Sequence, residues 1–504
     1  MTAVARHKTA IARQHLSSPL QAVARYGLLD GTPSIFDYGC GRGDDVSALQ
    51  TAGYDAAGWD PHYFADAPVR EADIVNLGYV LNVIEEPEER VETAKKAFDL
   101  ARQCLVVSVL VVGQGDTSAL KPHGDGHLTR TGTFQKYFTQ PEASDLIQEA
   151  LGNEPIAVAP GIFFVFRDKV LEQRFLASRH RRARDISHLL HIVTPSSAEA
   201  TSSDRERVEE HRALLQKLWE VMLELGRLPA AEELDNELSG EVICTLGSIR
   251  EAGRLAQLAF ESSSLKEARN ARIADLKVYF ALNLFNKRKA YQELPAELRR
   301  DIKAFFGSHR NAEEAGREVL LSLSDPETIL ERCQEAANQG TGYLDGDHSL
   351  QLHVDLIERL SPELRAYVGC AEKLYGDVSQ ADLVKIHIQS GKLTLIKCEK
   401  FKQIAIPRIT ERIKIKMVDR DIDFFEYPDK KTAPRVYLKS RFMAEDQDGF
   451  AEQVAFDQKL KHLAVFDFSD FGPTVDELLR GLKQQGLAVQ GFDLVPREKV
   501  VGRR

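Results

Sequence analysis

A run of glycines after an apolar segment, at residues 35–44, constrains the fold of this chain more than any other feature. The apolar residues lead into Asp37, and Gly39, Gly41 and Gly43 then follow at alternate positions. A buried strand ends in this way when the next turn must bring its backbone close to a ligand, because glycine tolerates positive φ and has no Cβ. The pattern predicts the first strand of an α/β domain with a ligand at its tip.

The residues after this turn indicate the charge of the ligand. The dinucleotide fingerprint G-x-G-x-x-G requires a third glycine where this chain has Asp44, and Asp45 follows. Two carboxylates would repel the pyrophosphate that such a helix start otherwise receives. A cationic ligand without phosphate suits the turn better, and S-adenosylmethionine (SAM), which carries a sulfonium, is such a ligand.

A second acid follows the glycine turn at the spacing expected of a nucleotide-binding unit. Asp60 ends the next predicted strand, 17 residues past Gly43, and in nucleotide-binding α/β units an acid about 20 residues past the glycine turn accepts the ribose hydroxyls. An ordinary α/β turn with a capping Asp is the alternative. The following strand begins at Asp73, which leaves no room for a helix and a third strand. We therefore expect a trimmed sheet, with Asp66 and Asp73 as the carboxylates available to the adenine ring.

Asn76 and Tyr79 lie at the tip of that next strand, on the ligand side of an open α/β sheet. Amino-group DNA methyltransferases have Asn/Asp-Pro-Pro-Tyr/Phe here: the amide or acid accepts hydrogens from the base amine, and the aromatic ring stacks on the flipped base. This chain has Leu77 and Gly78 in place of the prolines. Asn76 and Tyr79 are the candidate catalytic residues, and Asn76 also borders the expected cofactor. The alternative is that Asn76 only forms a turn and that Tyr79 only packs under the next helix.

These motifs are similar to those of class I SAM-dependent methyltransferases. More closely, the chain resembles the methyltransferases associated with DNA phosphorothioation gene clusters, in DYGCGRGDD (37–45), GWDP (58–61), NLGYVLNVI (76–84), ADLVKIHI (381–388) and KSR (439–441). The resemblance implies a cytoplasmic bacterial protein in a DNA-modification or phage-defence setting. It further implies other proteins of a DNA-modification system as partners.

Composition excludes several other classes of protein. The 504 residues can form several domains, and the net charge of −10 means that any nucleic-acid contact must be local. The six cysteines form no C-x-x-C pair, so we expect neither a zinc site nor disulfides. No apolar run reaches the length of a membrane span, and the first residues lack the apolar core of a signal peptide, so we expect no membrane association.

The remainder of the first domain, residues 1–170, follows from periodicity. We expect a helix at 21–29 that acts as a lid or covers the sheet, a helix at 85–103 and a buried strand at 104–112. The loop at 113–133 is a candidate substrate cover. It carries His123, Asp125 and His127, which could be a base or metal ligands, although no metal is predicted.

The chain then changes character. A connector at 171–203 is rich in arginine, and its Arg181, Arg182 and Arg184 could contact nucleic-acid phosphates or simply line a solvated helix. Residues 204–375 are predicted to form a helical domain.

Residues 376–504 are predicted to form a basic α+β domain with antiparallel strands. Between residues 385 and 441 there are 15 Lys and Arg against 7 Asp and Glu, with aromatic residues interleaved. Lys414 and Lys416 alternate with apolar residues, as on a half-exposed sheet that could bind nucleic acid. Lysines that protect an edge strand are the alternative.

Together these features predict a Rossmann-like methyltransferase domain, a helical region and a C-terminal α+β region. The expected function is SAM-dependent methylation of nucleic acid, with DNA favoured over RNA. A catalytically inactive subunit that binds SAM and DNA is the second hypothesis.

Overall fold

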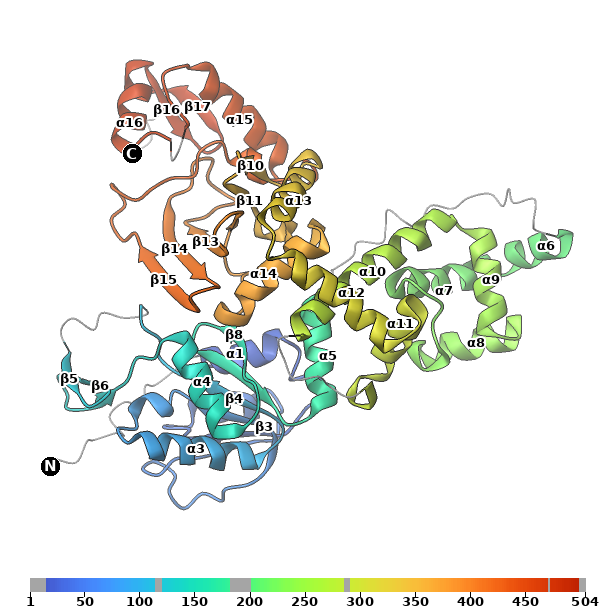
Figure 1. Cartoon of the computed structure of the whole chain (residues 1–504), viewed down its shortest axis with the longest axis horizontal. Coiled ribbons are helices and arrows are strands. Elements are labelled where there is room, and N and C mark those ends of the chain that lie inside the picture. Colours follow the sequence, from blue (N-terminus) through green and yellow to red (C-terminus); the bar gives the residue numbers. More distant parts are fainter. Residues whose placement is uncertain (1–14, 114–119, 182–200, 285–290, 470–471, 498–504) are drawn as a thin grey trace. The chain divides into compact units, whose positions relative to one another are not determined.

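The computed structural model describes residues 15–113, 120–181, 201–284, 291–469 and 472–497. The chain divides into two compact units. The first contains Met1–Asp168, Asp325–Leu360 and Tyr367–Arg504, and the second contains Lys169–Ser324 and Ser361–Ala366 (Figure 1). The boundaries expected at 170, 203 and 375 stay predictions.

The first unit begins with an open, mostly parallel sheet in the order β2-β1-β3-β4-β9-β8. The first four of these strands are parallel, β9 is antiparallel to β4, and β8 is antiparallel to β9. The strands are β1 (Ile35–Tyr38), β2 (Ala56–Trp59), β3 (Ala72–Gly78), β4 (Ala101–Ser108), β8 (Ile156–Ala159) and β9 (Ile162–Phe166). This is a Rossmann-like arrangement, as the glycine turn predicted.

Helices cover both faces of this sheet (Figure 1). One face, with Phe36, Val75 and Leu105, packs against α3 and α4. On the other side α1 contacts β3 and β4 through buried side chains that include Leu20 and Val23. The helices are α1 (Ser18–Arg25), α2 (Asp44–Thr51), α3 (Pro87–Leu100) and α4 (Gln140–Leu151).

The sheet is trimmed, as the sequence predicts. Residues 60–71 connect β2 to β3 through a turn closed by a bridge between Asp60 and Phe64. Within the described residues no strand lies beyond β2, which is therefore an edge of the sheet.

Several boundaries differ from those that the sequence predicts, and the buried strand expected to reach residue 112 ends at Ser108. The helix expected at 85–103 ends at Leu100, and β4 begins at Ala101, because Ala101 and Cys104 are buried in the sheet. The helix expected at 21–29 begins earlier, at Ser18, with Pro19 in its first turn, where its missing N–H costs no hydrogen bond.

A second, antiparallel sheet in the first unit has the order β10-β11-β12-β13-β14-β15. The antiparallel pairing expected around Lys414 is confirmed. The structure also places two strands, β10 and β11, in the stretch predicted to be helical. The strands are β10 (Tyr343–Asp345), β11 (Ser349–His353), β12 (Leu383–His387), β13 (Lys392–Cys398), β14 (Ile409–Lys416) and β15 (Asp421–Glu426).

Other elements of the first unit are helical or form small hairpins. The helices are α13 (Pro326–Asn338), α15 (Phe450–His462) and α16 (Val475–Gln484), and the chain ends in the hairpin of β16 (Leu487–Gln490) and β17 (Asp493–Pro496). Helix α14 (Pro362–Tyr375) begins in the second unit and continues into the first.

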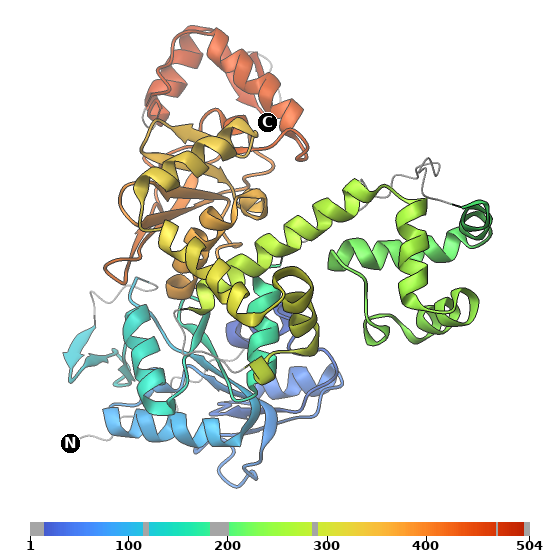
Figure 2. The same ribbon diagram turned by 45° about the vertical axis from the view of Figure 1, so that its right-hand side comes forward.

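The second unit is helical in the residues that the structure describes (Figure 2). Its core contains Trp219 stacked on Phe260, with ring centroids 5.4 Å apart. The helices are α5 (Lys169–Arg179), α6 (Ser202–Glu210), α7 (Arg212–Leu225), α8 (Asn236–Leu246), α9 (Ile249–Ala259), α10 (Ser262–Asn283), α11 (Ala296–Phe306) and α12 (His309–Ser322).

Buried charges link three parts of this second unit. Asp301 on α11 accepts hydrogen bonds from Arg227 at 2.7 Å and from Arg272 on α10 at 2.7 and 2.9 Å. Arg227 also donates two hydrogen bonds to Glu233. Asp301, Arg227 and Arg272 are all buried, so each charge depends on its partners.

No described helix is long and apolar enough to cross a lipid bilayer.

Candidate functional site

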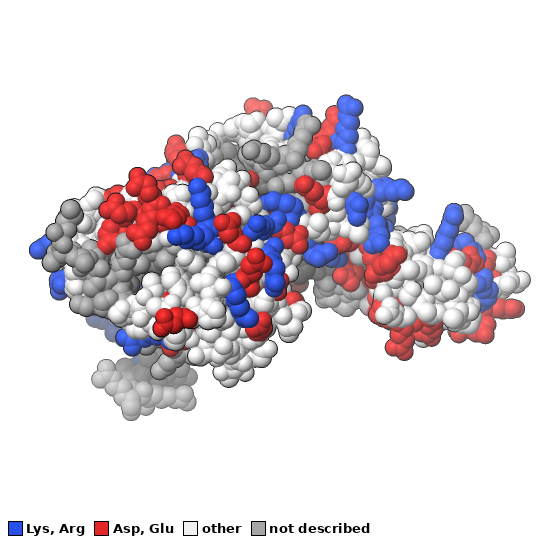
Figure 3. Space-filling model, turned by 90° about the horizontal axis from the view of Figure 1, so that it is seen from below, with Lys and Arg blue, Asp and Glu red and all other residues white. Residues whose placement is uncertain are grey.

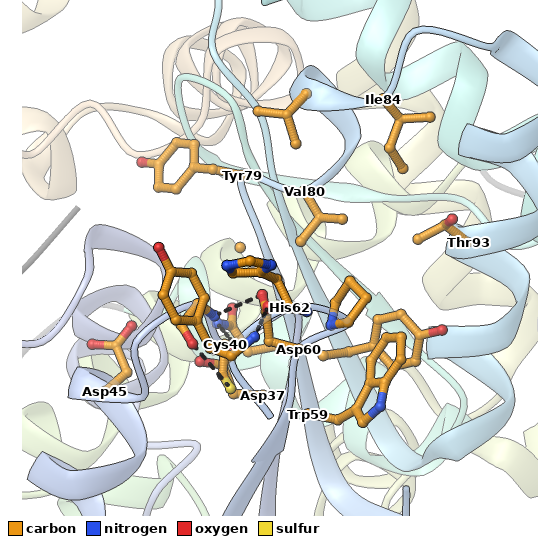
Figure 4. Close-up of a pocket in the computed structure, with 18 of the residues that line it drawn as sticks. Asp37, Cys40, Asp45, Trp59, Asp60, His62, Tyr79, Val80, Ile84 and Thr93 are labelled. Carbon is orange, nitrogen blue, oxygen red and sulfur yellow. Dashed lines mark hydrogen bonds between the residues drawn. The ribbon is translucent and has the colours of Figure 1, made fainter. Parts of the chain in front are cut away.

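A cavity lies at the carboxyl ends of β1, β2 and β3. The chain leaves β1 for β2 on one side and later returns to β3 on the other, and ligands of open α/β sheets bind at such a switch point. In register, Asp37 pairs with Gly58 on one neighbour and with Asn76 on the other. The cavity has a volume of about 880 Å³ (Figure 4), within the usual size range of ligand sites.

The glycine turn forms one wall of this cavity. Gly39, Gly41 and Gly43 have φ of 88°, 54° and 78°, the left-handed region in which glycine is favoured. Gly39 and Gly41 line the cavity, whereas Gly43 precedes the first residue of α2. A Cβ on Gly39 would lie 2.5 Å from Val80 Cγ2, so position 39 has no room for a side chain.

Asp60 holds the glycine turn and the following turn together. Its Oδ2 accepts a hydrogen bond from the Gly41 amide at 3.1 Å, and its Oδ1 accepts from the amides of His62 and Tyr63, both at 2.9 Å. A carboxylate offers about four acceptor positions. One position on Oδ2 therefore remains for a ligand hydroxyl.

Asp37 and Asn76 form a buried pair at the bottom of the cavity. The Asn76 amide donates from Nδ2 to Asp37 Oδ1 at 2.8 Å, and the two residues are 2% and 4% exposed, respectively. The carboxylate fixes the orientation of the amide, because the opposite orientation would place two oxygens together. Asn76 Oδ1 is buried without a hydrogen-bond partner among the described residues. Asn76 therefore lines the site with its nitrogen occupied by Asp37 and its oxygen buried and without a described partner.

Tyr79 has an unusual backbone conformation. Its φ is 58°, rare for a residue other than glycine, and its amide donates to the Ser108 carbonyl at 2.9 Å. Strained backbone of this kind clusters at ligand sites. Figure 4 shows Tyr79, Val80 and Ile84 on one side of the cavity and Asp60 and Trp59 on the other.

Sequence reasoning missed a large part of the cavity wall. Helix α3 contributes Glu89, Glu92, Thr93 and Lys96, whose spacing of three and four residues places them on one face of the helix. The sequence shows this periodicity, but it does not show which side of the helix faces the cavity. Other missed lining residues are Ser17, Arg42, His62, Tyr63, Val83 and Ile84.

The cavity is predominantly acidic. Among the described lining residues, only Arg42 and Lys96 oppose the carboxylates, which come from Asp37, Asp44, Asp45, Asp60, Glu89 and Glu92. In the face seen in Figure 3, acidic side chains likewise gather in one area, and elsewhere the two signs are mixed. Negative charge favours a cationic ligand and disfavours phosphate in this cavity.

Cys40 lines the cavity as a neutral thiol. Burial, and then the nearby carboxylates of Asp37 and Asp60, raise the pKa of Cys40 to about 12. Because the thiolate is the reactive form, Cys40 is a packing residue and not a nucleophile at neutral pH.

The two carboxylates proposed for adenine do not line this cavity. Asp73 lies at the opposite, amino end of β3, where it accepts hydrogen bonds from Ser34 and Arg102. Asp66 is exposed on the connection between β2 and β3. The trimmed edge explains both outcomes, because the strand that would bring a carboxylate to this point is missing.

The expected cover loop contains a small sheet of β5 (Lys121–His123), β6 (Gly126–Leu128) and β7 (Phe134–Gln135). Arg90 on α3 donates to Asp125 in a two-pronged contact, 2.8 Å from Nη2 to Oδ1, and Lys136 lies 3.0 Å from the same carboxylate. The Asp125 carboxylate is therefore paired with two positively charged side chains, Arg90 and Lys136. Within the described part of the chain no group of three or more His, Cys, Asp and Glu residues could hold a metal ion.

The contact between Arg90 and Asp125, which anchors the small sheet to α3, predicts how this sheet responds to mutation and pH. The hydrogen bond from Arg90 lowers the pKa of Asp125 well below its usual range, against the opposing effect of burial. The stabilisation is therefore complete above about pH 4 and is lost only as the pH falls towards that lowered value. We expect limited proteolysis within residues 120–135 to be equally slow at pH 8 and pH 5, and several-fold faster in Asp125→Asn. Asp66→Asn, on an exposed turn, is the control. Equal cleavage of the two variants would contradict the anchor.

Of the residues predicted to bind nucleic acid, those that the structure describes do not line this cavity. Arg181 donates to Glu224 within the second unit, at 3.1 Å. Arg182 and Arg184 lie outside the described residues. Lys414 and Lys416 are on β14, and Lys416 forms ion pairs of 2.9 Å with both Asp421 and Asp423. Its charge is therefore already neutralised.

No protein-family model matches this chain, and no curated protein sequence matches it. Solved structures that resemble part of it are methyltransferases. The 1,6-didemethyltoxoflavin-N1-methyltransferase of Burkholderia thailandensis, solved with 1,6-didemethyltoxoflavin and S-adenosylhomocysteine, is 15% identical, and the match covers 30% of this chain and 78% of that one, with a TM-score of 0.23. Magnesium protoporphyrin IX methyltransferase of Synechocystis PCC 6803, with bound S-adenosylhomocysteine, is 16% identical over 32% of this chain and 93% of that one, with a TM-score of 0.24. The CcbJ methyltransferase of Streptomyces caelestis is 12% identical over 32% and 93%, with a TM-score of 0.23. The Rossmann-like assignment of the first sheet rests on its strand order and connections.

Proposed function

We propose that this chain is a SAM-dependent methyltransferase. The observation that carries the proposal is the acidic cavity at the switch point of the first sheet, bounded by the glycine turn and by Asp60. SAM combines a sulfonium, an ammonium and an adenosine, so it matches both the negative charge and the hydroxyl acceptor.

The residues present fit such a ligand. Gly39 and Gly41 expose backbone where the methionine end would lie, and Asp60 keeps one acceptor position for a ribose hydroxyl. Asp44 and Asp45 lie in the first turn of α2 and offset the positive end of its dipole, which disfavours phosphate at this helix start.

The chain would contribute mainly positioning. Bound SAM supplies an electrophilic methyl group on sulfur. Tyr79, Val80 and Ile84 line the opposite side of the cavity, where they could orient an acceptor whose lone pair forms the new bond to the methyl carbon as the carbon–sulfur bond breaks. Holding both reactants in near-attack geometry can supply much of the rate.

The acceptor we propose is nucleic acid, DNA more than RNA, in a bacterial cytoplasmic DNA-modification or phage-defence system. Support comes from the resemblance in sequence motifs and from the cationic strands of the second sheet. The acidic cavity would admit an uncharged base but repel its phosphates, so the backbone must be held elsewhere on the chain.

The second candidate is a SAM-binding subunit without catalytic activity. The burial of Asn76 favours it, because the side chain is only 2% exposed and its acceptor atom, Oδ1, is itself buried and therefore poorly placed to meet a base amine. Incubating the full chain with methyl-labelled SAM and DNA or RNA separates the two. Labelled nucleic acid supports the enzyme, and SAM binding without labelled product supports the subunit.

The cofactor assignment is tested by calorimetric titration with SAM. We expect Asp60→Ala to weaken SAM binding roughly 10- to 100-fold, because a hydrogen bond to a charged group contributes about 1.5–3 kcal/mol. The matched control is Asp55→Ala, just before β2 at its other end, which removes only an exposed ion pair with Arg70. Equal SAM affinity in Asp60→Ala and the parent would remove Asp60 from the site.

A further inference from the structure

One face of the second sheet carries cations on three neighbouring strands. The register places Lys385 of β12 beside Thr394 of β13, and Thr394 beside Lys414 of β14. Because side chains two residues apart share a face, the same face has further cations in the flanking rows, Lys392, Arg412 and Lys416, and it also carries His387.

These cations are close enough to His387 to shift its pKa. Burial, followed by the positive charges of Lys385, Lys414, Lys392 and Arg412, lowers the pKa of His387 to about 4. The His387 ring nitrogen Nε2 lies 2.9 Å from Thr394 Oγ1. Like charges held together in this way are unfavourable in the absence of an anion.

Few carboxylates compensate this face. Lys416 is paired with Asp421 and Asp423, and Asp345 opposes Lys385. Lys385, Lys392 and Lys414 form no ion pair with a described carboxylate. The row through Thr394 holds two lysines, Lys385 and Lys414, and one carboxylate, Asp423 of β15, which is in register with Lys414. This row therefore keeps a net positive charge, although the whole chain is negative.

An exposed aromatic ring borders the same cations. Phe425 on the edge strand β15 pairs with Arg412, so it shares their face, and it is 43% exposed. Lys414 Nζ lies 6.0 Å from the centre of its ring. Phe424, the neighbouring residue, points to the other face, where it lies against Gly113.

We propose that this face binds single-stranded nucleic acid: Lys385, Lys392, Arg412 and Lys414 contact successive phosphates, and Phe425 stacks on a base. The proposal extends the proposed function, for which it supplies the surface that holds the substrate backbone. Side chains two residues apart on a strand are separated by about 6.6 Å, comparable to the spacing of phosphates along an extended strand. A sheet face with an exposed ring suits unpaired bases, whereas the bases of a duplex are stacked on one another.

Fluorescence anisotropy on the full chain, without SAM, tests this surface. The probe is a labelled single-stranded DNA 20-mer of mixed sequence, with the same sequence as a duplex for comparison. We expect the single strand to bind more tightly than the duplex. Lys414→Ala should weaken binding several-fold and reduce the salt dependence by about one released counterion. Phe425→Ala should weaken it roughly tenfold, the loss of one stacked base.

Two substitutions serve as matched controls. Lys416→Ala removes a neutralised lysine from the same strand and face, and Val418→Ala shortens an apolar side chain that is 81% exposed just after β14. Both should leave affinity within about twofold. Equal losses in Lys414→Ala and Lys416→Ala, tighter binding of the duplex, or no effect of Phe425→Ala would each overturn the proposal.

Titration with SAM distinguishes this result from the proposed function. Absent single-strand binding by a chain that still binds SAM would refute the surface alone. Single-strand binding that is lost in Phe425→Ala, in a chain that does not bind SAM, would support the surface and refute the methyltransferase.

Discussion

Gly39→Ala is expected to weaken SAM binding by roughly a hundredfold. The new Cβ would lie 2.5 Å from Val80 Cγ2, at a residue whose φ is 88°. Relieving the overlap must move the glycine turn or Val80, both of which form walls of the cavity. Overpacking costs about 1–3 kcal/mol, and each 1.4 kcal/mol of lost binding energy is a factor of ten in affinity. Calorimetric titration with SAM measures the loss.

Gly53→Ala is the matched control for this substitution. Gly53 has a nearly identical φ of 90°, but a Cβ there would meet no atom within 4 Å. Both variants should lose about 1 kcal/mol of stability from backbone strain, the overlap adds a further loss in Gly39→Ala, and only Gly39→Ala should lose SAM affinity. Adding Val80→Ala to Gly39→Ala should restore part of the affinity by removing the overlap. Unchanged SAM affinity in Gly39→Ala would show that the ligand does not approach this turn.

Asp301→Ala should destabilise the second unit by about 3–5 kcal/mol. The substitution leaves Arg272 without its carboxylate and Arg227 with only Glu233, and both arginines are buried. Removing one charge from a buried ionic cluster lowers the free energy of unfolding by more than the whole cluster contributes to it, because the remaining charge stays buried without its partner. Unfolding in urea, followed by the fluorescence of the buried Trp219, reports on this unit.

The neighbouring residue Glu232 provides the control. It forms an exposed ion pair with Arg300, and its side chain is 72% exposed. Glu232→Ala should cost less than about 1 kcal/mol. Should Asp301→Ala prove too unstable to purify, Asp301→Leu combined with Arg272→Met replaces two charges by apolar groups and should recover part of the loss. Equal costs for Asp301→Ala and Glu232→Ala would contradict the buried cluster.

The residues at the centre of the site could be predicted because their positions depend on local rules. Asp37, Gly39, Asp60 and Asn76 each follow an apolar segment, and the ends of parallel strands meet at one edge of a sheet. The short connection after Asp60 likewise predicted the trimmed edge, since no helix and strand fit into it.

Features that depend on distant pairing were not predictable. Strand β11 forms because Gln351 pairs with Lys385, more than thirty residues away, and its five residues carry no strand pattern strong enough to identify alone. The end of α3 was misplaced because Ala101 suits a helix equally well and only its burial beside β3 decides. Similarly, the partners of Lys416 are set by the turn into β15, so its neutralisation could not be inferred from the alternation of residues.

The position of Asp60 has a thermodynamic consequence for the rim of the cavity. One carboxylate orders two separate backbone segments, and the same carboxylate has a single acceptor position left. Ligand binding at that position and the ordering of residues 60–64 must then be coupled. If ordering the segment lowers the free energy of ligand binding, ligand binding lowers the free energy of ordering by the same amount. A substitution that merely stiffens this short segment would tighten cofactor binding without touching the cofactor.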